Sequence, residues 1–252
     1  MVGGALALTL KGKQSLNFGL LTVIRQLQQM LSNKILDFLF NLQFTVDLPA
    51  EVEVINPFTD IETASIVDVF YKKYYSDNNS RYCIIGINPG RFGGGVTGIP
   101  FTDPIRLERE CGIENNWQRK QELSSVFVYE LINAYGGPDA FYNKFYFTAI
   151  SPLGFTRAGK NLNYYDDKLL AERIVPFAVD CFRKQIDWGL ETSVAFCLGE
   201  GTNYKFLSKL NSEYKLFDKI IPLSHPRFIM QYKLKTKGDY IERYLSEFDK
   251  LL

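Results

Sequence analysis

The 252-residue chain has few metal-binding and disulfide-forming residues and no long apolar segment. It contains one histidine, which excludes metal sites that need two imidazoles. Its four cysteines, Cys83, Cys111, Cys181 and Cys197, include no CxxC pair, and the partner pair that an iron–sulfur site would need is absent. We interpret them as reduced, mostly buried thiols of a cytoplasmic protein. The sequence lacks an uninterrupted apolar run of membrane-spanning length, so we expect neither a membrane span nor a secretory signal.

The chain also lacks an excess of either charge. Its 29 Lys and Arg residues balance 28 Asp and Glu residues, for a net charge of +1. Any site for a polyanion must therefore be a local patch. The length and the 46% hydrophobic content are enough for one sizeable core. We expect an N-terminal extension over residues 1–30, a loose tail followed by the start of a helix, and a single domain over residues 31–252.

Four short apolar and aromatic runs alternate with helical patterns. The runs have the length and composition of buried strands: Tyr82–Ile87, Tyr146–Ile150, Ser193–Leu198 and Lys219–Leu223. Helical patterns cover Leu16–Phe44, Thr63–Tyr75, Trp117–Tyr135, Asp166–Ile186 with an interruption at Pro176, Thr202–Leu210 and Asp239–Leu252, and Leu48–Phe58 is expected to be a loop. This alternation predicts an α/β fold with a mostly parallel sheet covered on both faces. Binding sites in such folds lie beyond the carboxyl ends of the strands.

A glycine-rich loop, Asn88–Phe101, follows the first of these strands. It contains a formal GxGxxG match, but Pro100 and Pro104 oppose the long helix that a dinucleotide site needs. The Asn-Pro-Gly sequence is by itself a favourable turn. The alternative is a ligand site, because glycines permit close approach of a ligand and the rings of Phe92 and Phe101 offer stacking faces. That alternative would suit a planar ligand.

The single histidine, His225, follows the last strand directly, and Pro226 favours an extended conformation for it. A lone histidine is commonly structural. Here, however, both Asn88 and His225 are expected at the carboxyl edge of one sheet, where sites form. Downstream, Arg227, Lys233, Lys235 and Lys237 form either a solvated basic loop or a phosphate-binding one.

Together these segments resemble the uracil-DNA glycosylase superfamily, and most of all its single-strand-selective monofunctional branch. The resemblance spans roughly residues 60–250. The matching residues are Gly86-Ile87-Asn88-Pro89-Gly90 with Phe92-Gly93, Thr97-Gly98-Ile99-Pro100-Phe101, Ser151-Pro152-Leu153, Gly159-Lys160-Asn161-Leu162 and His225-Pro226. It implies a compact three-layer α/β/α domain around a central four-stranded, mostly parallel sheet.

The resemblance implies catalytic roles for Asn88 and His225. The amide oxygen of Asn88 would accept a hydrogen bond from the attacking water and direct the water at C1′ of deoxyribose. A neutral amide is a poor base, so bond breaking would run ahead of attack, through an oxocarbenium-like sugar and a departing uracil anion. His225 would donate a hydrogen bond to uracil O2, and this bond strengthens as negative charge develops.

The resemblance also implies base and DNA contacts. Phe101 would stack on the flipped base, and backbone groups of Ile87 would contact the edge of that base. Arg227 and Phe228 lie where the family places a wedge that fills the vacated stack, and Lys233 and Lys235 would contact phosphates.

Four further positions bear on base specificity. Gly90 replaces the tyrosine with which stricter uracil glycosylases exclude the thymine methyl group, so we expect tolerance of 5-substituted uracils and of deaminated purines such as hypoxanthine or xanthine. Ala149 stands where the family carries its base-reading asparagine. Ser151, Thr148 or backbone groups are the candidates to replace that asparagine.

The favoured hypothesis is a monofunctional DNA glycosylase of base excision repair, acting as a monomer on uracil-containing DNA, with no cofactor, metal or membrane partner. No lysine stands at a motif position suited to attack C1′, which favours hydrolysis over Schiff-base chemistry. Two alternatives remain open: a catalytically inactive nucleic-acid-binding domain of the same fold, and a nucleotide hydrolase whose glycine loop binds phosphate.

Overall fold

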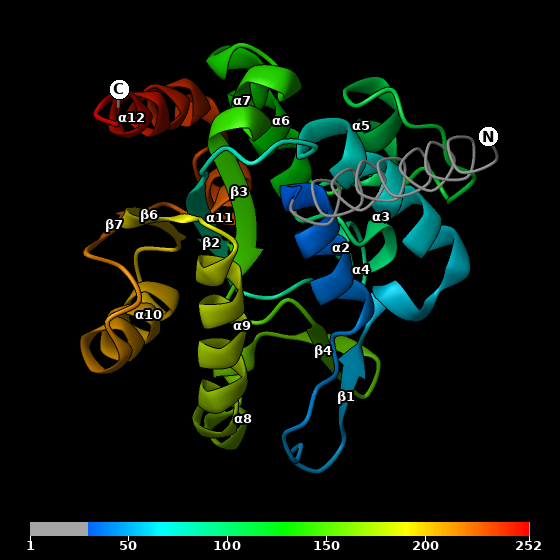
Figure 1. Cartoon of the computed structure of the whole chain (residues 1–252), viewed down its shortest axis with the longest axis vertical. Coiled ribbons are helices and arrows are strands. Elements are labelled where there is room, and N and C mark those ends of the chain that lie inside the picture. Colours follow the sequence, from blue (N-terminus) through cyan, green and yellow to red (C-terminus); the bar gives the residue numbers. More distant parts are fainter. Residues whose placement is uncertain (1–29, 252) are drawn as a thin grey trace, which may run out of the picture.

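The computed structural model describes residues 30–251, and a four-stranded sheet lies at its centre. The strands are β2 (Tyr82–Gly86), β3 (Phe145–Ala149), β6 (Glu191–Leu198) and β7 (Lys219–Leu223). They are arranged in the order β3-β2-β6-β7, and each neighbouring pair is parallel (Figure 1). The expected α/β fold is confirmed, and all four expected strands are present, with bounds within two residues of those expected.

Helices pack on both faces of this sheet (Figure 1). The longer helices are α2 (Leu31–Phe40), α3 (Ile61–Tyr74), α6 (Leu123–Tyr135), α9 (Val175–Asp187), α10 (Thr202–Tyr214) and α12 (Lys237–Asp249). Shorter ones are α4 (Gly94–Thr97), α5 (Pro104–Arg109), α7 (Pro138–Lys144), α8 (Lys168–Arg173) and α11 (Pro226–Tyr232), with 3-10 turns η1 (Pro57–Thr59), η2 (Tyr164–Asp166) and η3 (Leu234–Thr236). The expected helix with an interruption at Pro176 is divided into α8 and α9, because Pro176 occupies the first turn of α9.

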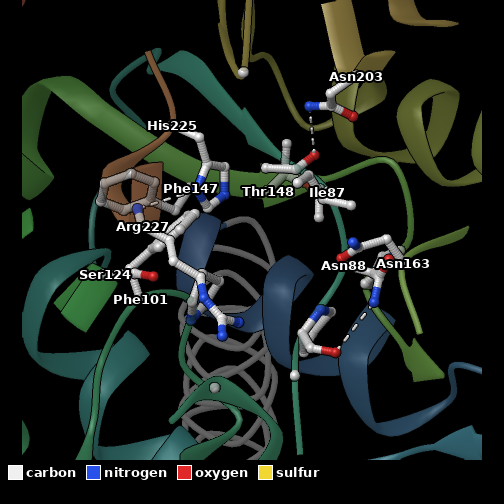
Figure 2. A pocket seen from close by; sticks show the side chains of 18 of the residues that line it. Ile87, Asn88, Phe101, Ser124, Phe147, Thr148, Asn163, Asn203, His225 and Arg227 are labelled. Carbon is white, nitrogen blue, oxygen red and sulfur yellow. Dashed lines mark hydrogen bonds between the residues drawn. The ribbon is translucent and has the colours of Figure 1, made fainter. Parts of the chain in front are cut away.

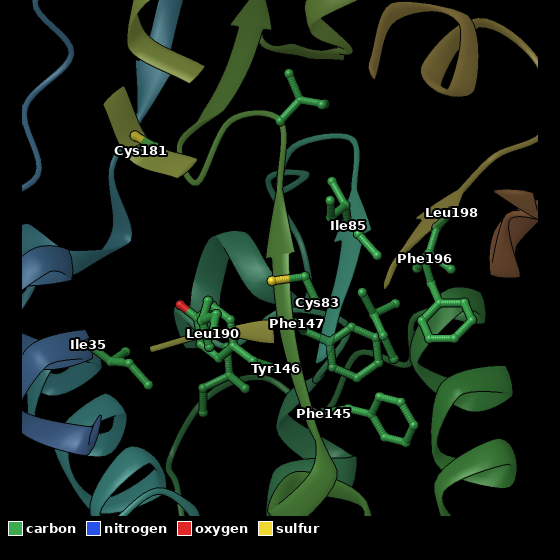
Figure 3. Packing of buried hydrophobic residues seen from close by; sticks show 14 of the residues in the cluster. Ile35, Cys83, Ile85, Phe145, Tyr146, Phe147, Cys181, Leu190, Phe196 and Leu198 are labelled. Carbon is green, nitrogen blue, oxygen red and sulfur yellow. The ribbon is translucent and has the colours of Figure 1, made fainter. Parts of the chain in front are cut away.

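Alternating side chains of β3 connect the three layers. Figure 3 shows Phe145 and Phe147 on one side of β3 and Tyr146 on the other, as the strand period requires. The ring of Phe145 lies 4.3 Å from that of Phe248 in α12, between ring centroids. On the opposite face, the ring of Tyr146 lies 6.2 Å from that of Trp188, which follows α9. The core is therefore continuous through the sheet.

A second, smaller sheet was not expected. The strands β1 (Val52–Ile55), β4 (Gly154–Arg157) and β5 (Lys160–Leu162) pair antiparallel in the order β1-β4-β5. The expected loop over Leu48–Phe58 thus contains a strand and a 3-10 turn. The β4–β5 hairpin matters for function because it reaches the loop that follows β2, as described below.

Two expectations concern the ends of the chain and its cysteines. The N-terminal extension, residues 1–30, lies outside the described residues except for Met30. All four cysteines are buried and unpaired, as expected, and burial raises the pKa of the Cys83, Cys181 and Cys197 thiols to about 12. Among the helices of residues 30–251, none has the length and apolar character needed to cross a bilayer.

Candidate active site

Asn88 lies two residues beyond the carboxyl end of β2, and its side chain is held from three sides. Its Nδ2 group donates to the carbonyl of Leu162, at 3.1 Å, and to that of Pro89, at 3.2 Å. Its Oδ1 accepts a hydrogen bond from the backbone N–H of Tyr164, at 2.9 Å. Both amide hydrogens are therefore used, and one lone pair of Oδ1 remains for a further donor. In this orientation the amide can accept a hydrogen bond from water.

His225 lies at the carboxyl end of β7 and caps the N-terminus of α11. Its backbone is extended, with φ −62° and ψ 133°, as Pro226 predicts. Its Nδ1 accepts a hydrogen bond from the backbone N–H of Arg227, at 3.2 Å, which places the imidazole proton on Nε2. Burial, together with the nearby charge of Arg227, lowers the pKa of His225 to about 4. At neutral pH this side chain is a neutral donor.

Asn88 and His225 lie on opposite sides of one pocket of about 770 Å³ (Figure 2). Such a volume is in the range of small-molecule sites. Nine of the residues expected to act on the base or the DNA line it: Ile87, Asn88, Gly90, Phe101, Thr148, Ala149, His225, Arg227 and Phe228. The pocket therefore brings Ala149 of β3 together with residues that follow β2 and β7, although β6 separates β2 from β7 in the sheet.

Phe101 forms one wall of the pocket, next to His225. Its ring lies 6.1 Å from the imidazole and 5.3 Å from the ring of Phe147, between centroids. Its backbone has a positive φ of 54°, which is unusual for a phenylalanine. The flanking segment is fixed by the hydroxyl of Thr97, which donates to the carbonyl of Thr102 at 2.7 Å. The ring is thus held at the pocket by a constrained loop.

The glycines of the loop after β2 allow chain segments to pack against one another. A Cβ on Gly95 would lie 2.0 Å from the carbonyl oxygen of Gly90. A Cβ on Gly93, whose φ is 59°, would lie 1.7 Å from a carboxylate oxygen of Glu122. The short helix α4 in this loop agrees with the expectation that no long dinucleotide-type helix follows. The glycines therefore serve internal packing, a reason that the sequence did not reveal.

Three of the residues expected to contact the base or the phosphates do not line the pocket. Ser151 is buried, and its hydroxyl donates to the carbonyl of Leu153 at 2.7 Å, so a local turn uses its hydrogen bond. Lys233 and Lys235 are exposed beyond the end of α11. The segment after His225, expected to be a loop, is a seven-residue helix that begins at Pro226.

Several lining residues were not found from the sequence. Glu122 lies at the N-terminus of α6, where burial and the neighbouring charge of Asp103 raise its pKa to about 7, against a lowering effect of Arg227. Asn203 of α10 is buried, donates to the carbonyl of Leu198 at 3.0 Å and accepts from the Tyr164 hydroxyl at 2.8 Å. Neither residue belongs to a motif that would have identified it. Within residues 30–251, no group of three or more His, Cys, Asp or Glu side chains is placed to hold a metal ion.

The profile of the Uracil DNA glycosylase superfamily matches residues 72–249. The chain belongs to this superfamily. A crystal structure of wild-type SMUG2 from Pedobacter heparinus is similar over 88% of this chain and 98% of that one, with 50% sequence identity and a TM-score of 0.86. No curated protein matches the chain. The family and this relative confirm the resemblance to the SMUG-like branch and support a uracil-DNA glycosylase type of function.

Proposed function

We propose that the protein is a monofunctional DNA glycosylase that hydrolyses the N-glycosidic bond of uracil in DNA and leaves an abasic site. One observation carries this proposal. The acceptor Oδ1 of Asn88 and the neutral donor Nε2 of His225 face the same pocket from opposite sides. Such a pair suits a reaction in which water approaches one side of a sugar while charge develops on a departing base.

In the proposed reaction the bond between C1′ and N1 of uracil breaks first. Asn88 has no basic group, so it orients the water and does not abstract a proton early. The oxygen of the water forms the new bond to C1′, and after attack its proton passes to the solvent, from which the released uracil anion takes up a proton. The electron pair of the broken bond leaves with uracil, and the N–H of His225 stabilises the charge at O2.

Phe101 would stack on the flipped base, and the base edge would contact Ile87 and the wall near Ala149. Arg227 and Phe228 lie in the first turn of α11 and line the pocket. Phe228 is 42% exposed, which suits a side chain that enters the vacated base stack. Lys233 and Lys235 extend from the same segment and would contact phosphates farther along the strand.

Gly90 leaves room at the pocket for larger bases. We therefore propose that 5-substituted uracils and deaminated purines are also substrates. Gly90 lines the pocket, so a side chain at this position would reduce the space available to a base, which supports this extension.

The test uses a labelled uracil-containing oligonucleotide, with alkaline cleavage of abasic sites as the readout. We expect cleavage with the wild-type protein and a loss of about 10²-fold or more with Asn88→Ala, because misplacing the water is costly. The matched control is Asn133→Ala, which removes an exposed amide that hydrogen-bonds Glu110 away from the pocket. Equal activity of Asn88→Ala and the control would contradict the proposal.

A second candidate, a catalytically inactive nucleic-acid-binding domain, is favoured by Ala149, because a methyl group at the pocket wall cannot read a base edge. Retained oligonucleotide binding with no abasic product from any deaminated base would support that candidate. Release of free base from a nucleoside monophosphate, with none from DNA, would instead indicate a nucleotide hydrolase.

A further inference from the structure

A second hollow, of about 300 Å³, opens directly beside the pocket that contains Asn88 and His225, which we call the base pocket. It is lined by Arg91 and Phe92 from the glycine loop, by Lys120 before α6, by Lys160 of β5 and by Arg227 of α11. We call these five residues the basic groove. The lining of this second hollow also includes Glu122, Ser124 and Asn161, which, like Arg227, line the base pocket as well, so the two hollows are continuous.

Four cations from four separate segments meet in the basic groove, against one carboxyl group, that of Glu122. The net charge of the whole chain is only +1, so this concentration is a local feature. In the part of the chain that the structure covers, none of the four cations forms an ion pair. The carboxyl of Glu122 also has a raised pKa, which weakens its opposition to an anion. The groove therefore attracts negative charge.

Phe92 holds two of these cations together. The Nζ atom of Lys120 lies 3.3 Å from the centroid of the Phe92 ring, and the guanidinium carbon of Arg91 lies 4.8 Å from it. The guanidinium of Arg91 also donates to the carbonyl of Gly159, which ties it to the β4–β5 hairpin. An aromatic face stabilises a cation without cancelling its charge. This arrangement keeps both charges in place for an external anion.

We propose that the basic groove binds the phosphodiester backbone of the substrate strand next to the flipped nucleotide. The inference rests on the proposed function, because a nucleotide whose base enters the pocket must leave its backbone at the rim. The basic groove forms the part of the rim where cations gather. Backbone phosphates make sequence-independent contacts that position a strand, and the flipped base then supplies the selectivity.

The test is the salt dependence of binding to a single-stranded, uracil-containing oligonucleotide, measured by fluorescence anisotropy. The variant is the double substitution Lys120→Gln and Lys160→Gln, and both side chains are exposed, so the fold should be retained. Each lost phosphate contact on a single strand reduces the slope of log K against log salt by about 0.7, so we expect a reduction of about 1.4.

The matched control is the double substitution Lys215→Gln and Lys219→Gln, which removes the same charge from two exposed residues. Lys219 begins β7 and Lys215 lies four residues before it, whereas His225 lies beyond the other end of this strand. This control should keep the wild-type salt slope. A third variant, Phe92→Ala, should reduce the slope less than the double substitution, because Lys120 loses its aromatic support but keeps its charge. An unchanged slope for Lys120→Gln/Lys160→Gln, or an equal loss in the control, would overturn the proposal.

The groove and the proposed function can fail separately. If the wild type releases no base but the groove variant alone loses salt-dependent binding, the groove proposal stands and the glycosylase proposal falls. If the wild type releases uracil while the groove variant binds and reacts as the wild type does, the glycosylase proposal stands and the groove proposal falls.

Discussion

Replacing His225 with asparagine separates the two tasks of this side chain. Its Nδ1 caps α11 by accepting a hydrogen bond from the N–H of Arg227, at 3.2 Å, while its Nε2 group is free to donate into the pocket. Asparagine is among the favoured N-cap residues and can accept the same backbone hydrogen bond. Its shorter side chain then has no N–H at the position of Nε2. His225→Asn should therefore keep the fold and lose the donor.

The magnitude follows from the charge on the departing base. Removing one donor to a developing anion costs about 10²–10³ in rate, or about 3–4 kcal/mol. The thermal midpoint of His225→Asn should stay near that of the wild type. In contrast, His225→Ala loses the donor and the cap together, so it should show the same rate loss and an additional destabilisation of about 1 kcal/mol.

The assay is single-turnover cleavage of uracil from a labelled oligonucleotide, measured between pH 5.5 and 8.5. The pKa of His225 is lowered to about 4, so the imidazole stays neutral throughout this range, and no inflection from it is expected. A rate for His225→Asn within about threefold of the wild type would refute the donor role. A wild-type inflection near pH 6.5 that disappears in the variant would refute the neutral state.

Three further predictions concern the pocket rim. Gly90→Tyr should abolish activity on 5-substituted uracils and deaminated purines in a substrate panel. The Cβ of the new tyrosine would also lie 3.0 Å from the Asn161 amide nitrogen. Unchanged processing of these bases would refute the steric account. Gly93→Ala should destabilise the protein by about 1 kcal/mol or more in denaturant titrations, because φ at residue 93 is positive and the added Cβ would meet Glu122. In a double-mutant cycle, Glu122→Ala should recover part of the lost stability. The pKa of Glu122 is raised to about 7, so the folded state binds this proton more tightly than the unfolded state does, and the free energy of unfolding should fall as pH rises from about 4.5 to 7. Glu122→Gln should remove that fall. An unchanged pH dependence in this variant would contradict the assignment.

The central sheet could be predicted because strands buried on both faces appear in the sequence as short apolar runs. Tyr82–Gly86 and Phe145–Ala149 are such runs, bounded by helical patterns. The small sheet could not be predicted in this way. The strand Lys160–Leu162 has three residues, two of them exposed, and pairing with β4 makes it a strand. Its own sequence carries no strand period.

The site was predictable to a similar degree. Asn88 and His225 were expected to share a sheet edge because parallel strands end on the same side, and both line the pocket. The short helix after His225 had a signal, since a proline at the first helical position is favourable, but the segment was interpreted as a loop. Glu122 had none, because its place opposite Gly93 depends on tertiary packing between α6 and the glycine loop.

The small sheet also determines what Asn88 can do. An amide in water presents two donors and an acceptor, and nothing in the residue type decides which of them faces a substrate. Here the carbonyl of Leu162, at the end of β5, takes one amide hydrogen, and the N–H of Tyr164 fixes the oxygen on the other side. The carbonyl of Pro89 takes the other amide hydrogen, so the hairpin, the turn after it and Pro89 together leave Asn88 able only to accept. This restriction suits the binding of an attacking water, and it depends on a hairpin more than seventy residues away in the chain.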